Sequence, residues 1–334
     1  MLTIDSLLQG SWYVNVKNQR YHPENVAEMT RNGVAQIVGH CTSHKTNSQA
    51  LFVFLIRNNM EGMLCYFIAS TLKLKALIIN ISDIAIVKML IKEEYIAAYV
   101  MSHAYQVELP DGKRIGLIFD GNGPFPVSPI TISEFTPFPY AYFYFMTSGT
   151  TSKPKLVQYQ EIRLTANAHQ VSLYLNLSAR DNTLCFFPVQ YMYGLSTMLS
   201  SLISQGGLVF EQYQLSSVSE IISYYGINTL PLIGDWMIPL SKVLVASRVR
   251  LNTILNASDR LLNIQASQML TCCDVLWNNF GQTESGPRLF CQRLETVNDI
   301  EKRSRNSVVA PGFVMSDRIK IQLRKNSEDS TASS

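Results

Sequence analysis

The sequence predicts an α/β protein built on a largely parallel sheet, and two observations support this prediction. Short apolar runs alternate with helical stretches of ten or more residues along most of the chain, which is typical of β-α-β units. The chain has 334 residues, 47% hydrophobic and only 16% charged, so it can bury a large core without disulfides. This length predicts about two domains, or one large domain with a subdomain.

The first expected strand is LFVFLI at residues 51–56, because six consecutive apolar residues leave no solvated face. An apolar helical spacing between Met63 and Leu74 follows, and a second strand is expected at residues 76–81. The alternation continues with apolar runs at residues 113–121, 140–151, 182–189, 207–213, 227–233, 251–258 and 273–281. Because ligands of such sheets bind beyond the carboxyl ends of the strands, the loops that leave strands are the informative ones.

The composition excludes several classes of partner and site. The 28 Lys and Arg residues against 25 Asp and Glu residues give a net charge of +3, too low for the basic face of a nucleic-acid-binding protein. The six cysteines form no C-x-x-C pair and are expected to be reduced, mostly buried thiols. The N-terminus lacks the basic residues of a secretory signal, and no apolar run is long enough to span a membrane. We therefore expect a cytoplasmic protein without a membrane span.

The first loop with possible chemistry is MTSGTTSKPK, residues 146–155, between the apolar run YAYFYF and a helical stretch that begins near Glu161. Its hydroxyls, its two lysines and the backbone N–H groups around Gly149 suit a polyanionic phosphate chain. It lacks the second glycine that a Walker A loop has before its lysine, so the chain is not a P-loop NTPase. On composition alone, an exposed Ser/Thr-rich turn explains the loop equally well.

The second such loop is WNNFGQTE, residues 277–284, again directly after an apolar strand. Phe280 offers a flat apolar face and Gly281 permits a close approach of the backbone. Thr283 offers a hydroxyl, and Glu284 supplies a hard oxygen ligand for magnesium. Taken alone, this octapeptide is more often an ordinary exit from a strand.

Together and in this order, the two loops resemble the motifs of the adenylate-forming superfamily, the AMP-dependent synthetases and ligases that include acyl-CoA synthetases. MTSGTTSKPK resembles the signature [YM]-T-S-G-[TS]-T-G-x-P-K-G, and NNFGQTE resembles the later Y-G-x-T-E motif. FPVQYMYGLS at residues 187–196 is similar to the acyl-binding segment P-x-x-H-x-x-G-x, with Tyr191 in place of the histidine. NASD at residues 256–259 falls where the family places a G-G-[AE] turn beside adenine. The four landmarks are in register over roughly residues 30–320.

The resemblance implies the large N-terminal domain of this family: two stacked βα subdomains with mostly parallel sheets, plus a partial C-terminal β subdomain. It implies an AMP-forming acid–thiol ligase that uses ATP and Mg²⁺ to activate a carboxylic acid as its acyl-adenylate. The acyl group would then pass to CoA or to the phosphopantetheine thiol of a carrier protein, in a biosynthetic pathway. The expected ranges are 1–135 for the first subdomain, 136–290 for the second with the ATP-binding motifs, 291–323 for the β subdomain and 324–334 for a disordered tail.

The resemblance also implies the site residues. Thr283 would contact the α-phosphate, Glu284 would hold Mg²⁺ and Lys153 would bind the departing phosphates, so these three are the implied catalytic residues. The segment at Tyr191 has no aspartate to receive an α-amino group, which favours an acyl or aryl acid over an amino acid. The acyl pocket would be lined by Tyr191, Gly194 and Ser258, the β- and γ-phosphates bound by Thr147, Ser148, Gly149, Thr150, Thr151 and Lys153, and adenine framed by Ala257, Ser258, Asn278, Asn279, Phe280 and Gly281.

Two departures from the family pattern leave an alternative open. Ser152 and Leu156 replace glycines of the signature, which makes the loop bulkier and less able to adopt positive φ, so some loss of ATP affinity is expected. The sequence also ends before the family's T-G-D motif, its hinge and its mobile C-terminal domain with a catalytic lysine. A separate chain that supplies this lid is one interpretation, and a degenerate, non-catalytic nucleotide- or acyl-binding or scaffold subunit is the alternative to an enzyme.

Overall fold

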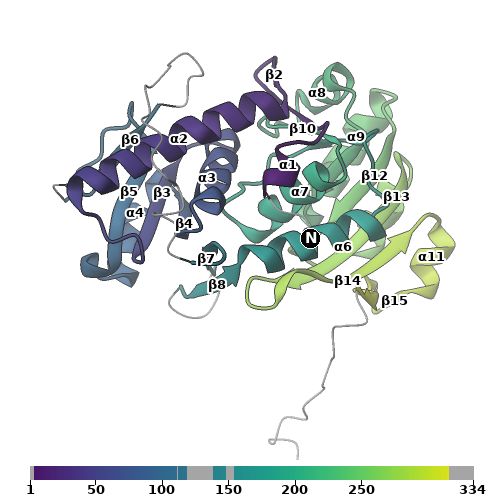
Figure 1. Ribbon diagram of the computed structural model, residues 1–334. Coiled ribbons are helices and arrows are strands. Elements are labelled where there is room, and N and C mark those ends of the chain that lie inside the picture. The colour runs from purple at the N-terminus through teal and green to yellow at the C-terminus, as the bar shows by residue number, and fades with distance from the viewer. Residues whose placement is uncertain (1–3, 111, 119–137, 148–153, 316–334) are drawn as a thin grey trace, which may run out of the picture.

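The computed structural model describes residues 4–110, 112–118, 138–147 and 154–315 of the chain. In this part of the chain, the strands form a nine-stranded sheet, a six-stranded sheet and a two-stranded ribbon. Figure 1 shows the two large sheets as two lobes with helices between and around them. The predicted α/β class, with two stacked and mostly parallel βα units, is confirmed.

The six-stranded sheet is built around β3 (Leu51–Ile56), whose six side chains are all buried. Such a strand belongs in the middle of a sheet that is covered on both faces. It pairs in parallel with β4 (Lys75–Asn80) and β5 (Ile96–Ser102), as the β-α-β pattern predicts. The outer strands are β6 (Arg114–Leu117) beside β5, β7 (Tyr142–Met146) beside β4, and the antiparallel β8 (Leu156–Gln160) at the edge.

Successive side chains of β3 point to opposite faces of this sheet. Phe52 and Phe54 join the core under two helices, α2 (Pro23–His44) and α3 (Asn59–Thr71). Val53 and Leu55 join a smaller core on the other face, under α4. The short helices of this half are α1 (Ile4–Leu7), η1 (Ile81–Asp83), α4 (Ile84–Leu90) and η2 (Glu93–Tyr95).

The nine-stranded sheet has the order β17 (Phe313–Val314), β14 (Gly286–Leu294), β13 (Cys273–Gln282), β12 (Leu251–Asn256), β11 (Thr229–Leu232), β9 (Asn182–Leu184), β10 (Gly207–Val209), β1 (Tyr13–Val16) and β2 (Gln19–Tyr21). Six neighbouring strands of this sheet run parallel to one another, in the order β1, β10, β9, β11, β12 and β13. Antiparallel pairs extend the sheet at both edges, with β2 beside β1 at one edge and β14 and β17 beyond β13 at the other.

One helix layer lies between the two sheets and another lies outside the larger one. All twelve residues of α7 (Met192–Ile203) are buried, because this helix contacts both α6 and the inner core that it shares with α2 and α3. The outer helices cover the far face of the nine-stranded sheet with a separate core. The remaining elements are α6 (Glu161–Tyr174), α8 (Val218–Tyr225), α9 (Gly234–Ala246), α10 (Asn263–Met269), α11 (Val297–Lys302) and the ribbon of β15 (Ser304–Arg305) and β16 (Val308–Val309).

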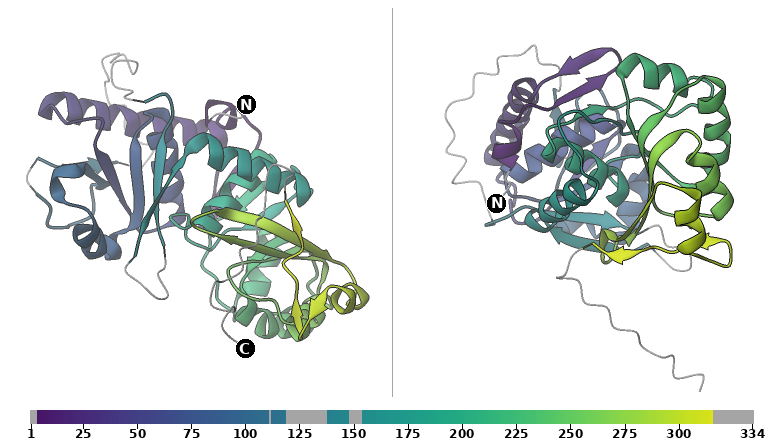
Figure 2. Two further views of the ribbon diagram at one scale, coloured as in Figure 1. Left: turned by 90° about the horizontal axis from the view of Figure 1, so that it is seen from below. Right: turned by 90° about the vertical axis from the view of Figure 1, so that its right-hand side faces the viewer.

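The chain enters the nine-stranded sheet twice, once before and once after it forms the six-stranded sheet. Strands β1 and β2, from the N-terminal end, complete the edge of the nine-stranded sheet, whereas the hairpin β7–β8, from the middle of the chain, completes the six-stranded sheet. Figure 2 shows the purple N-terminal hairpin against the green lobe. The sheets therefore do not divide at residue 135, and the expected domain ranges stay a prediction. The expected tail at 324–334 lies outside the described residues.

Several other expectations are met. Each predicted apolar run contains a strand, and α6 begins at Glu161 as expected. The six cysteines are free, and five of them are buried. Among the described residues, no helix combines the length and the apolar character that crossing a membrane requires. No individual strand was predicted for β1, β2, β5, β8, β14, β15, β16 or β17, although a β subdomain was expected at residues 291–323.

Candidate functional site

The predicted phosphate loop lies at the tip of an antiparallel hairpin. β7 and β8 pair from Tyr142–Gln160 to Met146–Leu156, and the loop leaves the carboxyl end of β7. Thr147 and Lys155 close the hairpin: the Thr147 N–H donates to the Lys155 carbonyl at 2.9 Å, and the Lys155 N–H donates to Thr147 Oγ1 at 3.2 Å. The predicted residues Ser148, Gly149, Thr150, Thr151 and Lys153 lie outside the described residues.

Leu156 does not require the backbone conformation of a glycine. It is the first residue of β8, it pairs with Met146, and it is absent from the described residues with positive φ. Its side chain packs against the core under α4. Leu156 is therefore accommodated without backbone strain, because an extended strand accepts a bulky residue readily, and the expected loss of ATP affinity stays a prediction. Ser152 lies outside the described residues.

The turn with Thr283 and Glu284 lies against this hairpin. The Tyr159 hydroxyl on β8 donates to the Thr283 carbonyl oxygen at 2.7 Å. Burial raises the pKa of Tyr159, and the nearby Glu284 carboxylate raises it further. The structure thus brings the turn of the second motif against β8, the strand that follows the phosphate loop, although Tyr159 and Thr283 are 124 residues apart in the sequence.

Asn278 and Asn279 hold the carboxyl end of β12 with their side chains. Asn256 Nδ2 donates to Asn278 Oδ1 at 2.9 Å, and Asn279 Nδ2 donates to the Asn256 carbonyl at 3.1 Å. Asn278 Nδ2 also donates to the Ala310 carbonyl at 3.1 Å, and the Tyr174 hydroxyl donates to Asn279 Oδ1 at 2.5 Å. Both amides are buried and bonded within the protein, so they shape the predicted adenine site by fixing its backbone.

The other residues predicted to frame adenine differ in exposure. Phe280 is 47% exposed and packs edge-on against Phe290 at 5.9 Å, which leaves its ring accessible for stacking. Ala257 is buried, whereas the exposed Ser258 has φ of 69° and forms the turn after β12. A Cβ on Gly281 would lie 2.3 Å from the Pro287 carbonyl oxygen, so this glycine permits the close crossing of β13 and β14.

The predicted acyl segment forms the first turn of α7. Tyr191 is its N-cap and is 46% exposed; burial raises the pKa of its hydroxyl, as does the nearby Asp83 carboxylate. Tyr191 thus faces the other lobe across the crevice. A Cβ on Gly194 would lie 2.3 Å from the Pro188 carbonyl oxygen, so Gly194 packs this turn against the loop before it.

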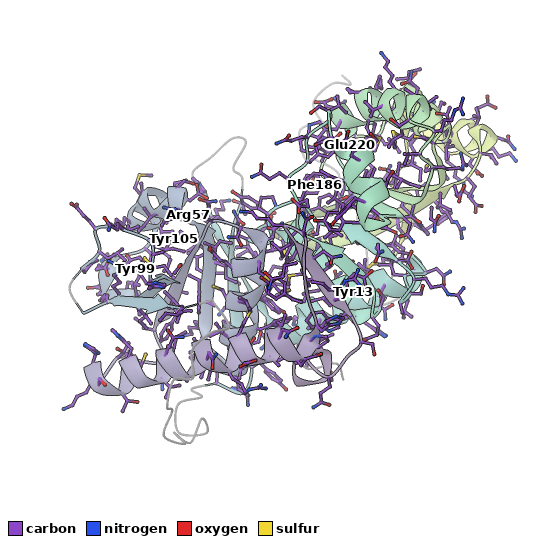
Figure 3. All side chains as sticks on the ribbon, turned by 90° about the horizontal axis from the view of Figure 1, so that it is seen from above. Tyr13, Arg57, Tyr99, Tyr105, Phe186 and Glu220 are labelled. Atoms are coloured by element: carbon purple, nitrogen blue, oxygen red, sulfur yellow. The ribbon has the colours of Figure 1, made fainter. Side chains whose placement is uncertain are left out.

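A cavity of about 1010 Å³ opens beside this segment, at the carboxyl ends of strands of both sheets. Arg57 and Glu61 line it from the first lobe, and Phe186 and Gln190 line it from the second. The Arg57 guanidinium stacks on the ring of Tyr105, and Figure 3 shows these two residues together with Phe186 across from them. Lys17 adds a second cation. Sequence analysis missed this cavity because Lys17 reaches it only through the long-range pairing of β1 with β10.

Arg288 on β14 is a further residue that sequence analysis missed. It is fully buried, its Nη2 donates to Thr197 Oγ1 at 3.3 Å, and its guanidinium lies 5.4 Å from the centre of the Tyr193 ring. The sequence carries a signal for it, since a lone arginine interrupts the apolar run GPRLF directly after the second motif.

Glu284 suits the implied metal. Its side chain is exposed and forms no ion pair within the described part of the chain, so its carboxylate oxygens are accessible. Protein sites for Mg²⁺ commonly supply only one or two carboxylates, and phosphates and water complete the octahedron. One acidic side chain beside a phosphate loop is therefore a sufficient protein contribution.

Solved structures of adenylating enzymes share this fold. The o-succinylbenzoate CoA synthetase MenE of Bacillus subtilis, solved with the acyl-adenylate OSB-AMP, superimposes with a TM-score of 0.70 at 14% identity, covering 92% of this chain and 66% of that one. The N-terminal subdomain of Klebsiella oxytoca NpsA, solved with 3-hydroxybenzoyl-AMSN, gives a TM-score of 0.71 at 16% identity, covering 93% of this chain and 79% of that one.

Sequence comparison gives the family directly. A segment of 92 residues is 33% identical to 4-coumarate–CoA ligase 4 of Arabidopsis thaliana, which amounts to 26% of this chain and 16% of that protein. The chain thus spans about two thirds of the length of MenE, and its match to the ligase covers a much smaller share. The model of the AMP-binding enzyme family matches residues 83–326, well over half of the chain. The chain belongs to the AMP-binding enzyme family.

Proposed function

We propose that the protein activates a carboxylic acid with ATP, forming an acyl-adenylate and pyrophosphate, and passes the acyl group to a thiol. The observation that carries this proposal is the contact between the second motif and β8, the strand that follows the phosphate loop, through the 2.7 Å hydrogen bond from Tyr159 to Thr283. Glu284, the only residue of the second motif that offers a carboxylate, is near enough to Tyr159 to raise the pKa of its hydroxyl, which supports a metal site on this side of the hairpin.

In the first step, a carboxylate oxygen of the acid attacks the α-phosphorus of ATP. The new bond joins this oxygen to phosphorus, and the bond from the α-phosphorus to the pyrophosphate oxygen breaks. The acid is already a nucleophile at neutral pH, so the step requires no general base. The residues of this chain bind and orient the reactants: Thr147 and the loop after it hold the terminal phosphates, and Thr283 contacts the α-phosphate.

Mg²⁺, when bound, neutralises charge on the phosphates and on the departing pyrophosphate. In this proposal Glu284 holds the ion, and Lys153 adds a second positive charge to the same phosphates. Phe280 stacks on adenine, since its ring is accessible at the mouth of the crevice.

In the second step, a thiol sulfur attacks the acyl carbonyl, AMP leaves, and the proton of the thiol passes to solvent. The cavity beside Tyr191 supports a thiol acceptor with a phosphate-bearing arm, such as CoA or carrier-protein phosphopantetheine. It is about 1010 Å³ in volume, and its lining includes the cations Lys17 and Arg57 together with apolar side chains. We place the enzyme in the cytoplasm, in a biosynthetic pathway.

The favoured acid is an acyl or aryl acid. Tyr191, Met192 and Tyr193 form the start of α7, and this segment has no carboxylate to bind an α-ammonium group. The ligands named for the two solved relatives, OSB-AMP and 3-hydroxybenzoyl-AMSN, also contain an aromatic ring in the acid part.

ATP–pyrophosphate exchange with pooled acyl, aryl and amino acids tests the proposal on the purified chain. Exchange with one pool is the expected result. Glu284→Gln is expected to lower the exchange rate about 10²-fold, because it removes one preorganised charge at the phosphates. Its matched control, Glu220→Gln on the exposed surface of α8, should exchange normally.

Two results would contradict the proposal. Normal exchange by Glu284→Gln would remove this carboxylate from the metal site. If the folded protein showed no ATP–pyrophosphate exchange with any pool, the result would favour the alternative of a non-catalytic nucleotide- or acyl-binding or scaffold subunit that needs a separate partner chain.

A further inference from the structure

Arg288 is a buried cation without a counter-ion. None of its side chain is exposed. Its Nη2 donates to Thr197 Oγ1 and the Tyr174 hydroxyl also lies within reach of the guanidinium, whereas Nε and Nη1 form no hydrogen bond of regular geometry with the described residues. The ion pairs formed within the described residues do not include it.

The groups around the guanidinium are uncharged. The ring of Tyr193 covers it at 5.4 Å, and Tyr174 and Cys185 are near enough to sense its charge. Burial raises the pKa of Tyr174 and Tyr193 well above neutrality, and it raises the pKa of the Cys185 thiol to about 12. Arg288 lowers each of these pKa values by a smaller amount. The three groups therefore remain protonated and supply no negative charge.

An arrangement of this kind is unfavourable in the free protein. A buried guanidinium loses its hydration, and each N–H group without an acceptor adds to the penalty. Compensation requires an opposite charge with good hydrogen-bond geometry. Since the described residues contain no such charge near Arg288, a ligand is the natural source of it.

The position of Arg288 identifies which part of a ligand could reach it. Tyr193, which covers the guanidinium, precedes Gly194 in the predicted acyl segment. Tyr174 donates its hydroxyl hydrogen to Asn279 of the predicted adenine frame at 2.5 Å. Arg288 thus lies between the predicted acyl segment and the predicted adenine frame, so we expect the end of the acid that is remote from the reacting carboxylate to reach it.

We propose that Arg288 binds a second, non-reacting carboxylate of the acid, so that the substrate class is a dicarboxylic acid. This inference rests on the proposed function. Arginine pairs with carboxylates through short, charge-assisted hydrogen bonds, and Nε and Nη1 retain N–H groups for them. Because Arg288 has no exposed surface, the proposal requires the buried Tyr193 ring, whose hydroxyl donates to the Leu255 carbonyl at 2.8 Å, to move aside when the acid binds.

The first test compares acids of matched skeleton, phthalate with benzoate and glutarate with valerate, in ATP–pyrophosphate exchange. The protein is expected to prefer the dicarboxylic acid of a pair about 10²-fold or more in kcat/KM, since a site built around a polar partner rejects an analogue that lacks it. Arg288→Met should abolish this preference. Arg293→Met is the matched control, because this arginine lies on the same strand but is half exposed and pairs with Glu295. It should retain the preference.

Equal use of both acids of a pair, or an unchanged preference in Arg288→Met, would overturn the inference while leaving adenylation intact. If no acid supported ATP–pyrophosphate exchange, the proposed function would fail instead. A second readout then tests Arg288 alone: the rise in Tm that dicarboxylic acids produce in the unaltered protein should be absent in Arg288→Met and present in Arg293→Met. An equal rise with the matched monocarboxylic acids, benzoate and valerate, would also overturn the inference.

The stability of the variants without ligand completes the test. Arg288→Met and Arg288→Gln are expected to melt at or above the Tm of the unaltered protein, because each removes an uncompensated buried charge. If both variants melted several degrees lower, the charge would be compensated within the protein, and the inference would fail.

Discussion

Gly194 allows α7 to lie close to the loop before it, because this residue has no side chain. The first turn of α7 lies so close to the preceding loop that a Cβ at this residue would be 2.3 Å from the Pro188 carbonyl oxygen and 2.6 Å from the Phe187 carbonyl oxygen. These are backbone atoms, so no side chain can rotate away to make room. The resemblance assigns Gly194 to the acyl pocket, and the geometry adds a packing role to that prediction.

Gly194→Ala is expected to destabilise the protein by about 1–3 kcal/mol, the usual range for overpacking a tight contact. Gly39→Ala is its control: a Cβ at Gly39, within α2, would meet nothing within 4 Å, and alanine favours a helix by roughly 0.5–1 kcal/mol. Urea unfolding of both variants measures the difference. Equal midpoints for Gly194→Ala and the unaltered protein would show that α7 can shift freely.

At the scale of single elements, α11 begins with a reciprocal cap. Thr296 is its N-cap and accepts from the Asp299 N–H, while the Asp299 carboxylate accepts from the N–H groups of Thr296 and Glu295. These hydrogen bonds, with the one from Glu295 first, lower the pKa of Asp299. Because this pKa is lower in the folded state than in the unfolded chain, ionised Asp299 stabilises the protein above the unfolded value of about 3.9.

Asp299→Asn is therefore expected to lower the free energy of unfolding at pH 7 by about 0.3–1 kcal/mol. The deficit should shrink as the pH falls through the folded pKa of Asp299, where the carboxylate of the unaltered protein becomes protonated as well. Urea unfolding at pH 7, 5 and 3 measures this trend, with the exposed Glu301→Gln on the same helix as control. A deficit that stayed constant with pH would contradict the assignment.

The elements also show what could be predicted. Strands at runs that are apolar throughout, such as residues 51–56, were predicted correctly, because a strand buried on both faces requires an apolar residue at every position. β8 was missed because its five residues, LVQYQ, mix polar and apolar types at a sheet edge. The phosphate loop was placed correctly after a strand, whereas residues 277–282 of the second motif lie within β13 and only Thr283 and Glu284 follow it. The bonding of Asn278 and Asn279 to Asn256 depends on the register of β12 and β13, which a single sequence does not contain.

At the scale of the whole molecule, Asn59 joins the two lobes. Its Nδ2 donates to the carbonyls of Cys185 and Phe187, at 2.8 and 3.1 Å, and its Oδ1 accepts from the Val189 N–H at 3.0 Å. Asn59 belongs to α3 of the first lobe, whereas its three partners belong to the loop before α7. One amide thus fixes the loop that carries the predicted acyl segment.

Asn59→Ala is expected to destabilise the protein by about 2 kcal/mol, since it leaves partly buried backbone groups without partners. It should also lower ATP–pyrophosphate exchange by raising KM for the acid more than it lowers kcat, because the loop before α7 loses its support. The exposed Asn252→Ala is the control for both measurements. An unchanged KM would mean that the loop keeps its conformation without this clamp.

The parallel pairing of β1 with β10 has a consequence for synthesis on the ribosome. β1 pairs first with β2 in the N-terminal hairpin, and residues 13–15 then wait for residues 207–209 before they gain their second strand partner, so this hairpin emerges almost two hundred residues ahead of its sheet. Pairing over such a separation is slow, and an open strand edge attracts other chains in the meantime. The nascent chain is thus expected to be most prone to aggregation at mid-translation, before residues 207–209 have emerged to cover this edge.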